Sequence, residues 1–320
     1  MAIGDAIVDV IATCDDSFIA DRGLTKGSMR LLSTAEADDL YAAMGPAREI
    51  SGGSAANSMA GLAALGLRAG FIGQIADDQL GEIFAHDMTS LGVAFATAPL
   101  TGGPPTGRCL IVVTPDAQRT MNTSPGASHE LTPEALDEDQ IRSAKVTFLE
   151  GYLWGPERPR AAMLKAAGIA RASGRKVAFT LSESLCIAGR REGVMSMIEA
   201  GTVDILFANE DEVRHLTGRD GLDDSLAELS LKVPTLVVTR GAAGALAIER
   251  GKRVEVPAAP VARVVDTTGA GDLFAAGFLA ARCREAPLAR CLHAGSLAAA
   301  EVISHFGARP ESDLRALVRL

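Results

Sequence analysis

Apolar, strand-like segments alternate with helical patterns through most of this chain, and this alternation constrains its fold more than any other feature. Helical periodicity over residues 158–172 ends at Gly174. Strand-like runs in the second half of the chain lie at 145–152, 176–181, 204–208 and 234–239. Strands that alternate with helices indicate a mostly parallel sheet covered on both faces. The sequence therefore predicts an α/β protein with a central parallel sheet flanked by helices.

Two segments, at about 11–50 and 94–121, interrupt this alternation with short β-like pieces and turn signals. Between them lies a helical stretch of small residues at 55–65. Two strand groups inserted into one α/β unit suggest a small β-sheet appendage, such as a lid. The sequence has no internal repeat and no low-complexity linker, so we expect a single domain over residues 1–320. Residues 1–4 resemble the end of a strand already under way, and the native start is expected a few residues upstream.

The composition excludes several classes of protein. Of the 320 residues, 48% are hydrophobic and 22% are charged, which is typical of a globular protein with a sizeable core. A net charge of −9 argues against the basic face that nucleic-acid binding needs. No apolar run approaches the roughly 18 residues of a membrane-spanning helix, and no signal peptide is visible. Five cysteines without a C-x-x-C pair indicate reduced thiols in a cytoplasmic protein: Cys14, Cys109, Cys186, Cys283 and Cys291.

The stretch 266–272, Asp-Thr-Thr-Gly-Ala-Gly-Asp, points most directly to chemistry, because an apolar helix pattern follows it. Free N–H groups at a helix N-terminus favour an anion, and Gly269 and Gly271 let the backbone approach a phosphate closely. Asp272, in the first turn, could accept a proton from a hydroxyl that attacks a phosphoryl group. The alternative is that Asp272 is only a favourable helix-start charge beside an ordinary turn. The full seven-residue string is more specific than that alternative.

The string at 266–272 resembles the C-terminal signature of the ribokinase-like (PfkB) carbohydrate and nucleoside kinases. Further motifs follow in the family's order along nearly the whole chain, at 4–9, 51–57, 125–127, 209–212 and 239–244. The resemblance implies a ribokinase-like α/β fold with a small β-sheet lid. It also implies an ATP-dependent phosphotransferase with an alcohol group as acceptor. In that family Asp272 would be the catalytic base, and Gly269, Ala270 and Gly271 would form an anion hole.

The N-terminal motifs assign the acceptor side of the site. By the resemblance, Asp5, Asp9 and Asn57 bind the acceptor, and Gly52 and Gly53 form a lid hinge beside it. Asp5 and Asp9 bracket the end of a strand, where open α/β sheets place ligands, and their carboxylates can accept hydrogen bonds from paired hydroxyls. The alternatives are solvated loop charges for the aspartates, an ordinary turn for the glycines and a helix cap for Asn57.

The later motifs assign the nucleotide side and two metals. The resemblance implies that Asn209 and Glu212 organise magnesium, with Glu212 acting through water, although their spacing equally fits a capping box. Contacts to ATP are implied for Asn209, Thr239, Gly241, Gly244 and Thr267. The loop at 302–310 resembles one that binds a monovalent cation, such as potassium, in many members. Its ligands, mostly backbone carbonyls, would come from Asp266, Thr268, Val302, His305 and Gly307. Glu311 departs from the Ser of that pattern.

The acceptor is predicted less directly than the phosphoryl donor. Residues 119–123, 149–154 and 207–213 resemble bacterial adenosine-kinase-like members. Tyr152 and Trp154 could stack on a base or could simply be core. Pro125 looks more like the sugar-kinase version, and the stretch 182–186 resembles the nucleoside group only loosely.

We therefore predict transfer of the γ-phosphoryl group of ATP to the 5'-hydroxyl of a nucleoside, adenosine, giving AMP and ADP, as in purine salvage. The alternative is a sugar kinase of the same family that acts on ribose, fructose or ketodeoxygluconate. A non-catalytic sensor with this fold is disfavoured, because a sensor has no need of the intact base Asp272 and its glycine loop. We expect a small-molecule substrate and no nucleic-acid or membrane partner, and both a monomer and a homodimer remain open.

Overall fold

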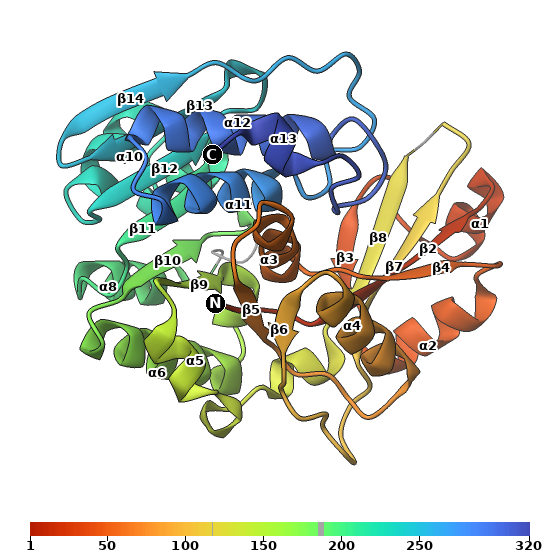
Figure 1. Cartoon of the computed structure of the whole chain (residues 1–320). Helices are drawn as coiled ribbons and strands as arrows, with labels where there is room; N and C mark the ends of the chain where they lie inside the picture. Colours follow the sequence, from red (N-terminus) through yellow and green to blue (C-terminus); the bar gives the residue numbers. More distant parts are fainter. Residues whose placement is uncertain (117, 185–188) are drawn as a thin grey trace.

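The computed structural model of the chain describes residues 1–116, 118–184 and 189–320. Cys186, and with it part of the stretch 182–186, lies outside the described residues. These residues form two sheets that lie side by side (Figure 1). The predicted α/β fold, with a mostly parallel sheet flanked by helices and a smaller second sheet, is confirmed.

The larger sheet has nine strands, and every neighbouring pair from β6 to β12 is parallel, whereas β13 and β14 add an antiparallel edge. Its order is β14 (Lys252–Val256), β13 (Ala245–Glu249), β12 (Thr235–Thr239), β11 (Ile205–Asn209), β10 (Lys176–Thr180), β9 (Val146–Glu150), β1 (Ala2–Ile3), β5 (Ala69–Ile72) and β6 (Val93–Phe95). Central strands of such a sheet are buried on both faces, which explains why they appear in the sequence as continuous apolar runs. The predicted strand at 145–152 ends at Glu150, where a 3-10 turn, η3 (Gly151–Trp154), follows.

Helices cover both faces of the larger sheet and divide its core in two. One face carries α5 (Glu138–Ser143), α6 (Glu157–Ala172), α8 (Arg191–Glu199), α9 (Glu210–Thr217) and α10 (Leu222–Ser230). The other carries α3 (Ser54–Ala64), α4 (Gln79–Ser90), α11 (Ala270–Cys283), α12 (Leu288–Val302) and α13 (Leu314–Val318). Short 3-10 turns lie at η1 (Gly126–Glu130), η2 (Pro133–Ala135) and η4 (Gly241–Ala243). Within the described chain, no helix has both the length and the apolar character needed to cross a membrane.

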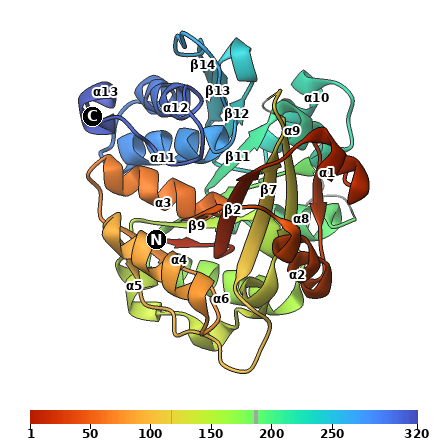
Figure 2. The ribbon, with the colours of Figure 1, turned by 90° about the vertical axis from the view of Figure 1, so that its right-hand side faces the viewer.

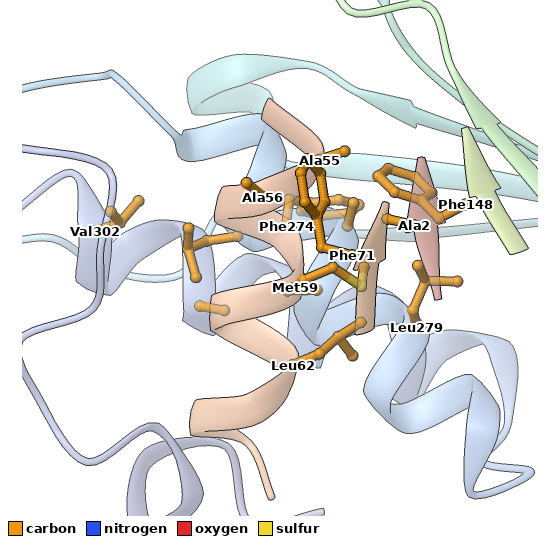
Figure 3. Packing of buried hydrophobic residues seen from close by; sticks show 14 of the residues in the cluster. Ala2, Ala55, Ala56, Met59, Leu62, Phe71, Phe148, Phe274, Leu279 and Val302 are labelled. Atoms are coloured by element: carbon orange, nitrogen blue, oxygen red, sulfur yellow. The ribbon is translucent and has the colours of Figure 1, made fainter. Parts of the chain in front are cut away.

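The core around α3 and α11 positions the site. Side chains of α3, α11 and strands β1, β5 and β9 meet there (Figure 3). α11 can approach α12 closely because a Cβ at Gly277 would lie only 2.4 Å from the carbonyl oxygen of Ala294. α3 packs equally closely on α11, because a Cβ at Gly61 would lie 2.8 Å from the Cβ of Ala276.

The smaller sheet has the order β3 (Met29–Leu31), β8 (Arg119–Ser124), β7 (Gly107–Val113), β2 (Ile7–Thr13) and β4 (Arg48–Ser51). Its residues alternate between two faces, as the period of a strand requires. Val8 and Val10 of β2 belong to the core that includes residues of α1 (Asp16–Asp21) and α2 (Thr34–Ala43), and these helices lie beside this sheet (Figure 2). Ile7 lies in a separate apolar cluster with residues of β7 and β8.

The strands of this sheet differ from the insert boundaries expected at about 11–50 and 94–121. Its first strand begins at Ile7, and its second segment covers 107–124. β6, which falls in the second expected insert, instead pairs with β5 in the larger sheet. The alternating pattern of β2 was missed because the strand continues almost directly from β1.

Candidate active site

A cavity of about 900 Å³ lies between the two sheets. Most of the residues predicted from the sequence line it: Asp5, Asp9, Gly53, Asn57, Asn209, Glu212, Thr239, Thr267, Thr268, Gly269, Ala270, Gly271 and Asp272. The remaining predicted residues are outside that lining: Gly52, Gly241, Gly244, Asp266, Val302, His305 and Gly307. The fold thus gathers residues from the first ten positions and from the last sixty into one hollow.

The glycine loop ends at the N-terminus of α11, as predicted. Gly269 takes a left-handed conformation with φ of +78° at the position before the helix, and a Cβ there would meet Ala308 at 2.6 Å. Gly271 has open space around its Cα. The N–H of Ala270 donates to the Thr267 carbonyl at 3.2 Å. The remaining amides at the positive end of α11 make this loop suitable for a phosphate.

The Asp272 side chain of α11 forms hydrogen bonds with two side chains of α3. Its Oδ1 accepts a hydrogen bond from Ser54 Oγ at 2.6 Å, and its Oδ2 accepts one from Asn57 Nδ2 at 2.9 Å. Burial raises the pKa of Asp272, while the hydrogen bonds from Ser54 and Asn57 lower it. A carboxylate with a raised pKa at the edge of a cavity is suited to accept a proton.

Asn57 is also turned toward the cavity. Its Nδ2 is engaged by Asp272, but its buried Oδ1 has no hydrogen-bond partner in the part of the chain that the structure describes. The alternative that Asn57 caps a helix is wrong, because α3 begins at Ser54 with Gly53 in the cap position. The Asn57 Oδ1 is therefore available to accept a hydrogen bond from a bound molecule.

Asp9 reaches the cavity from β2 of the smaller sheet, which is the predicted lid. A Cβ at Gly52 would lie 2.7 Å from the Asp9 carboxylate, so only glycine leaves room for this side chain. Burial raises the pKa of Asp9 to about 6; the charges of Arg119 and Arg309 lower it, and those of Asp272 and Asp266 raise it.

Asp5 lies deeper, at the end of β1. Its side chain is buried, and its Oδ1 is without a hydrogen-bond partner among the described residues. Burial raises the pKa of Asp5, while the charge of His129 and a hydrogen bond from Ser128 lower it. The alternative that Asp5 and Asp9 are solvated loop charges is therefore wrong.

Glu150 is a buried carboxyl group that the sequence analysis missed. At the end of β9, its Oε1 accepts the Asp5 N–H at 2.5 Å and its Oε2 accepts the Ala55 N–H at 2.7 Å. Burial raises the pKa of Glu150 well above its usual range, and the nearby charge of Asp5 adds to this shift. These two hydrogen bonds fix the backbone of Asp5, just after β1, and the start of α3. In the sequence, Glu150 is visible as a single acidic residue at the end of an apolar strand, and this pattern could have marked it as a candidate site residue.

Arg119 of β8 is a second group that was missed. It forms an ion pair with Asp266, and its Nη1 donates to Thr268 Oγ1 at 2.8 Å. The Asp266 carboxylate also accepts hydrogen bonds from Thr268 N at 3.0 Å and Gly307 N at 3.0 Å. Burial on its own would raise the pKa of Asp266. These hydrogen bonds and the Arg119 charge outweigh burial and hold the pKa of Asp266 below its usual value.

The surroundings of Asp266 bear on the predicted monovalent-cation site. Because the carboxylate oxygens are already engaged, a cation would have to be held by backbone carbonyls of this loop, as the resemblance implies. The His305 ring lies 3.3 Å from Glu301 Oε1, so its side chain has a structural contact. The site for a monovalent cation stays a prediction.

Asn209 and Glu212 form the capping box that their spacing allowed. Asn209 Oδ1 accepts the Glu212 N–H at 2.8 Å, and the Glu212 carboxylate accepts the Asn209 N–H at 2.9 Å and Nδ2 at 2.8 Å. Burial raises the pKa of Glu212 to about 7, against the hydrogen bond from Asn209. The described residues contain no cluster of three or more acidic, His or Cys side chains for a metal. Both oxygens of the Glu212 carboxylate accept hydrogen bonds from Asn209, and a magnesium ion held through water near Glu212 stays a prediction.

The aromatic patch predicted at the end of β9 is divided between core and cavity. Trp154 is buried, with its ring edge-on to Phe179 at a distance of 6.0 Å between ring centres, so of the two interpretations left open for it the structure supports the core. Tyr152 lines the cavity. Apolar residues of the smaller sheet line the cavity too, namely Ile7, Met29, Leu31, Cys109 and Met121, together with Phe207 of β11 and Phe274 of α11.

A helix N-terminus that can bind phosphate, a carboxylate beside it and a cavity between two sheets are the elements of a phosphotransferase site. Comparison with protein families gives a match to the pfkB family carbohydrate kinase model over residues 2–314. The chain belongs to this family of kinases, and it is a phosphotransferase with an alcohol group as acceptor.

Known relatives differ in the acceptor that their names give. The solved structure of an adenosine kinase from Sinorhizobium meliloti is 47% identical with a TM-score of 0.93, covering 99% of this chain and 97% of that chain. A probable sugar kinase from Rhizobium etli is 43% identical with a TM-score of 0.93, covering 99% and 96%. A 5-dehydro-2-deoxygluconokinase from Shouchella clausii is 31% identical over 279 residues, covering 83% of this chain and 86% of the relative.

Proposed function

We propose that this kinase transfers the γ-phosphoryl group of ATP to the 5'-hydroxyl of adenosine, giving AMP and ADP. The observation that carries the proposal is that the cavity lining combines acceptors for hydroxyl groups with apolar side chains. Asp9 and the unpartnered Asn57 Oδ1 suit the hydroxyls of a ribose. Apolar residues of the smaller sheet, such as Ile7, Met29 and Met121, suit a base. The 47% identity to the adenosine kinase from Sinorhizobium meliloti supports the same acceptor.

The reaction follows from the positions of the site residues. The 5'-oxygen attacks the γ-phosphorus, the bond to the oxygen that bridges the β- and γ-phosphorus breaks, and ADP leaves with that electron pair. Asp272 accepts the proton of the attacking hydroxyl, and the N-terminus of α11 stabilises the charge on the transferred group. Thr239 and Thr267, which also line the cavity, would contact the nucleotide. Magnesium, held through water near Glu212, would neutralise phosphate charge.

A panel of acceptors tests the choice of substrate. Contact between a base and the lid face is expected to contribute about 1–3 kcal/mol, by analogy with other base-binding proteins. Adenosine should therefore exceed ribose in kcat/KM by about 5- to 150-fold. Steady-state assays with adenosine, ribose, fructose and 5-dehydro-2-deoxygluconate at saturating ATP measure this ratio.

A sugar kinase is the second candidate, favoured by the identity to the 5-dehydro-2-deoxygluconokinase and to the probable sugar kinase. Hydroxyls of a sugar would suit Asp9 and Asn57 equally well. A higher kcat/KM for any of the three sugar acceptors than for adenosine would favour this candidate, and would leave the role of Asp272 unchanged.

The raised pKa of Asp9 predicts a pH dependence of acceptor binding. Asp9 has a pKa of about 6 in the folded protein, so it is ionised above pH 6 and becomes protonated below it. Because only the carboxylate can accept hydrogen bonds at both oxygens, the acceptor Kd should be constant near pH 8 and rise below pH 6. The rise should approach about tenfold per pH unit. Calorimetric titration of the acceptor without ATP measures this, with Asp9→Asn as a control that should be flat. A constant Kd down to pH 5 in the unmodified protein would contradict the assignment.

A further inference from the structure

Three consecutive residues near the C-terminus contact three parts of the site. The Gly307 N–H donates to Asp266 Oδ2 at 3.0 Å. Ala308 lies against Gly269, where a Cβ would come within 2.6 Å of the Ala308 Cβ. Arg309 extends to the segment around Gly52 and Gly53. The segment 307–309 therefore connects the glycine loop of α11 with the predicted lid hinge.

The Arg309 guanidinium holds both sides of the glycine pair. Its Nη2 donates to the Ser51 carbonyl at 3.0 Å and to Ser51 Oγ at 3.1 Å, and its Nη1 donates to the Ala56 carbonyl at 2.8 Å. Ser51 directly precedes Gly52, and Ala56 lies in the first turn of α3. One side chain thus spans the hinge from one end to the other.

Two other side chains restrict the same segment. The Ser51 N–H donates to Asp87 Oδ2 of α4 at 2.9 Å, and the Ala55 N–H donates to the buried Glu150 at 2.7 Å. Gly53 has a φ of +89°, which only glycine adopts readily. The Gly52 N–H also donates to the Ile7 carbonyl at 2.7 Å, and the Gly53 carbonyl accepts the Asn57 N–H at 2.8 Å. Rotation of the smaller sheet relative to α3 is therefore left to the Gly52 and Gly53 torsions between these two hydrogen bonds.

The contacts of Arg309 depend on its shape as well as on its charge. Burial lowers the pKa of Arg309 to about 10, and the charges of Asp9, Asp272 and Asp87 raise it. No carboxylate in the described part of the chain forms an ion pair with it, since its donors go to backbone carbonyls and to Ser51 Oγ. A planar guanidinium can reach two carbonyls at fixed angles, whereas a lysine ammonium cannot reproduce that fork.

We propose that Arg309 is a positioning residue for phosphoryl transfer, because it fixes the lid hinge relative to the loop that precedes Asp272. Asp9 lies on the lid side of the glycine pair, and Asn57 and Asp272 lie on the side of the larger sheet. Their separation therefore depends on the hinge that Arg309 holds. The inference rests on the proposed assignment of Asp9 and Asn57 to the acceptor, but it applies to a nucleoside and to a sugar alike.

Arg309→Lys tests this proposal while keeping the charge. A small misplacement of the acceptor lowers the rate steeply, since about 1 Å can cost about 10²-fold. We expect kcat to fall by about tenfold and the acceptor KM to rise several-fold, with the KM for ATP within about twofold of its original value. Arg290→Lys is the matched control, because Arg290 also donates to two backbone carbonyls, of Val318 and Arg319, but lies on α12 outside the cavity lining. It should leave all three constants unchanged.

Thermal melting of each variant shows whether a loss of activity comes from unfolding or from misplacement of the acceptor. If Arg309→Lys does not fold, the Ser51→Ala variant tests the proposal instead, because it removes only the hydroxyl that Arg309 contacts. We expect this variant to raise the acceptor KM about threefold without changing the KM for ATP. An Arg309→Lys variant with the kinetics of Arg290→Lys would overturn the proposal, as would equal losses for acceptor and ATP. The assays use whichever acceptor the unmodified enzyme prefers, so a wrong choice of adenosine is detected separately.

Discussion

Replacing Asp272 by asparagine is expected to lower kcat by about 10²- to 10⁴-fold, the usual range for loss of a general base. Asparagine keeps the size of the side chain, and its oxygen can still accept one of the hydrogen bonds from Ser54 and Asn57. It cannot accept the proton of the attacking hydroxyl, because an amide is not a base in water. The KM values for ATP and acceptor should change little.

A suitable control for Asp272→Asn is Asp313→Asn. Asp313 also lies at the start of a helix, where it caps α13, but it is not part of the cavity lining. Its replacement should affect only the melting temperature. Near-normal turnover of the Asp272 variant would remove this residue from the mechanism.

Replacing Asp9 by alanine is expected to weaken acceptor binding by about 10- to 150-fold. The loss corresponds to about 1.5–3 kcal/mol for a hydrogen bond to a charged group. ATP binding should be nearly unchanged, because Asp9 lies on β2, whereas the predicted nucleotide contacts Asn209 and Thr239 lie at the ends of β11 and β12. Separate titrations of acceptor and ATP measure the two affinities.

Asp38→Ala is the corresponding control on the lid. Asp38 belongs to α2 and forms an ion pair with Arg108, and it does not line the cavity. Its removal should leave both affinities unchanged. Equal weakening of acceptor and ATP binding by Asp9→Ala would mean that the pocket is wrongly assigned.

Local sequence patterns predicted the parts of this molecule that depend on local physics. The glycine loop before α11 and the strands β9 to β12 are specified by residues close together in the chain, so their periodicity and turn residues were sufficient. The capping box of Asn209 and Glu212 was likewise predictable from a spacing of three. The position of Asp272 followed from the helix start alone.

The missed residues make their contacts across long distances in sequence. An acidic residue at the end of an apolar strand marks Glu150 in the sequence but does not show what it contacts, because its partners, Asp5 and Ala55, are fixed only when β1, β9 and α3 pack together. Arg119 and Arg309 meet Asp266 and Ser51 for the same reason. Trp154 was open to two interpretations because an aromatic residue at a strand end can face either the core or a cavity. Only the packed structure decides which face it takes.

The segment 307–309 also bears on when activity can arise during synthesis. Asp5 and Asp9 leave the ribosome long before Gly307 and Arg309. Because proteins are made from the N-terminus, a nascent chain lacks the contacts to Asp266 and Ser51 until residue 309 has emerged. A chain interrupted between Asp272 and Gly307 therefore holds the predicted base and acceptor residues without the contacts that hold the hinge.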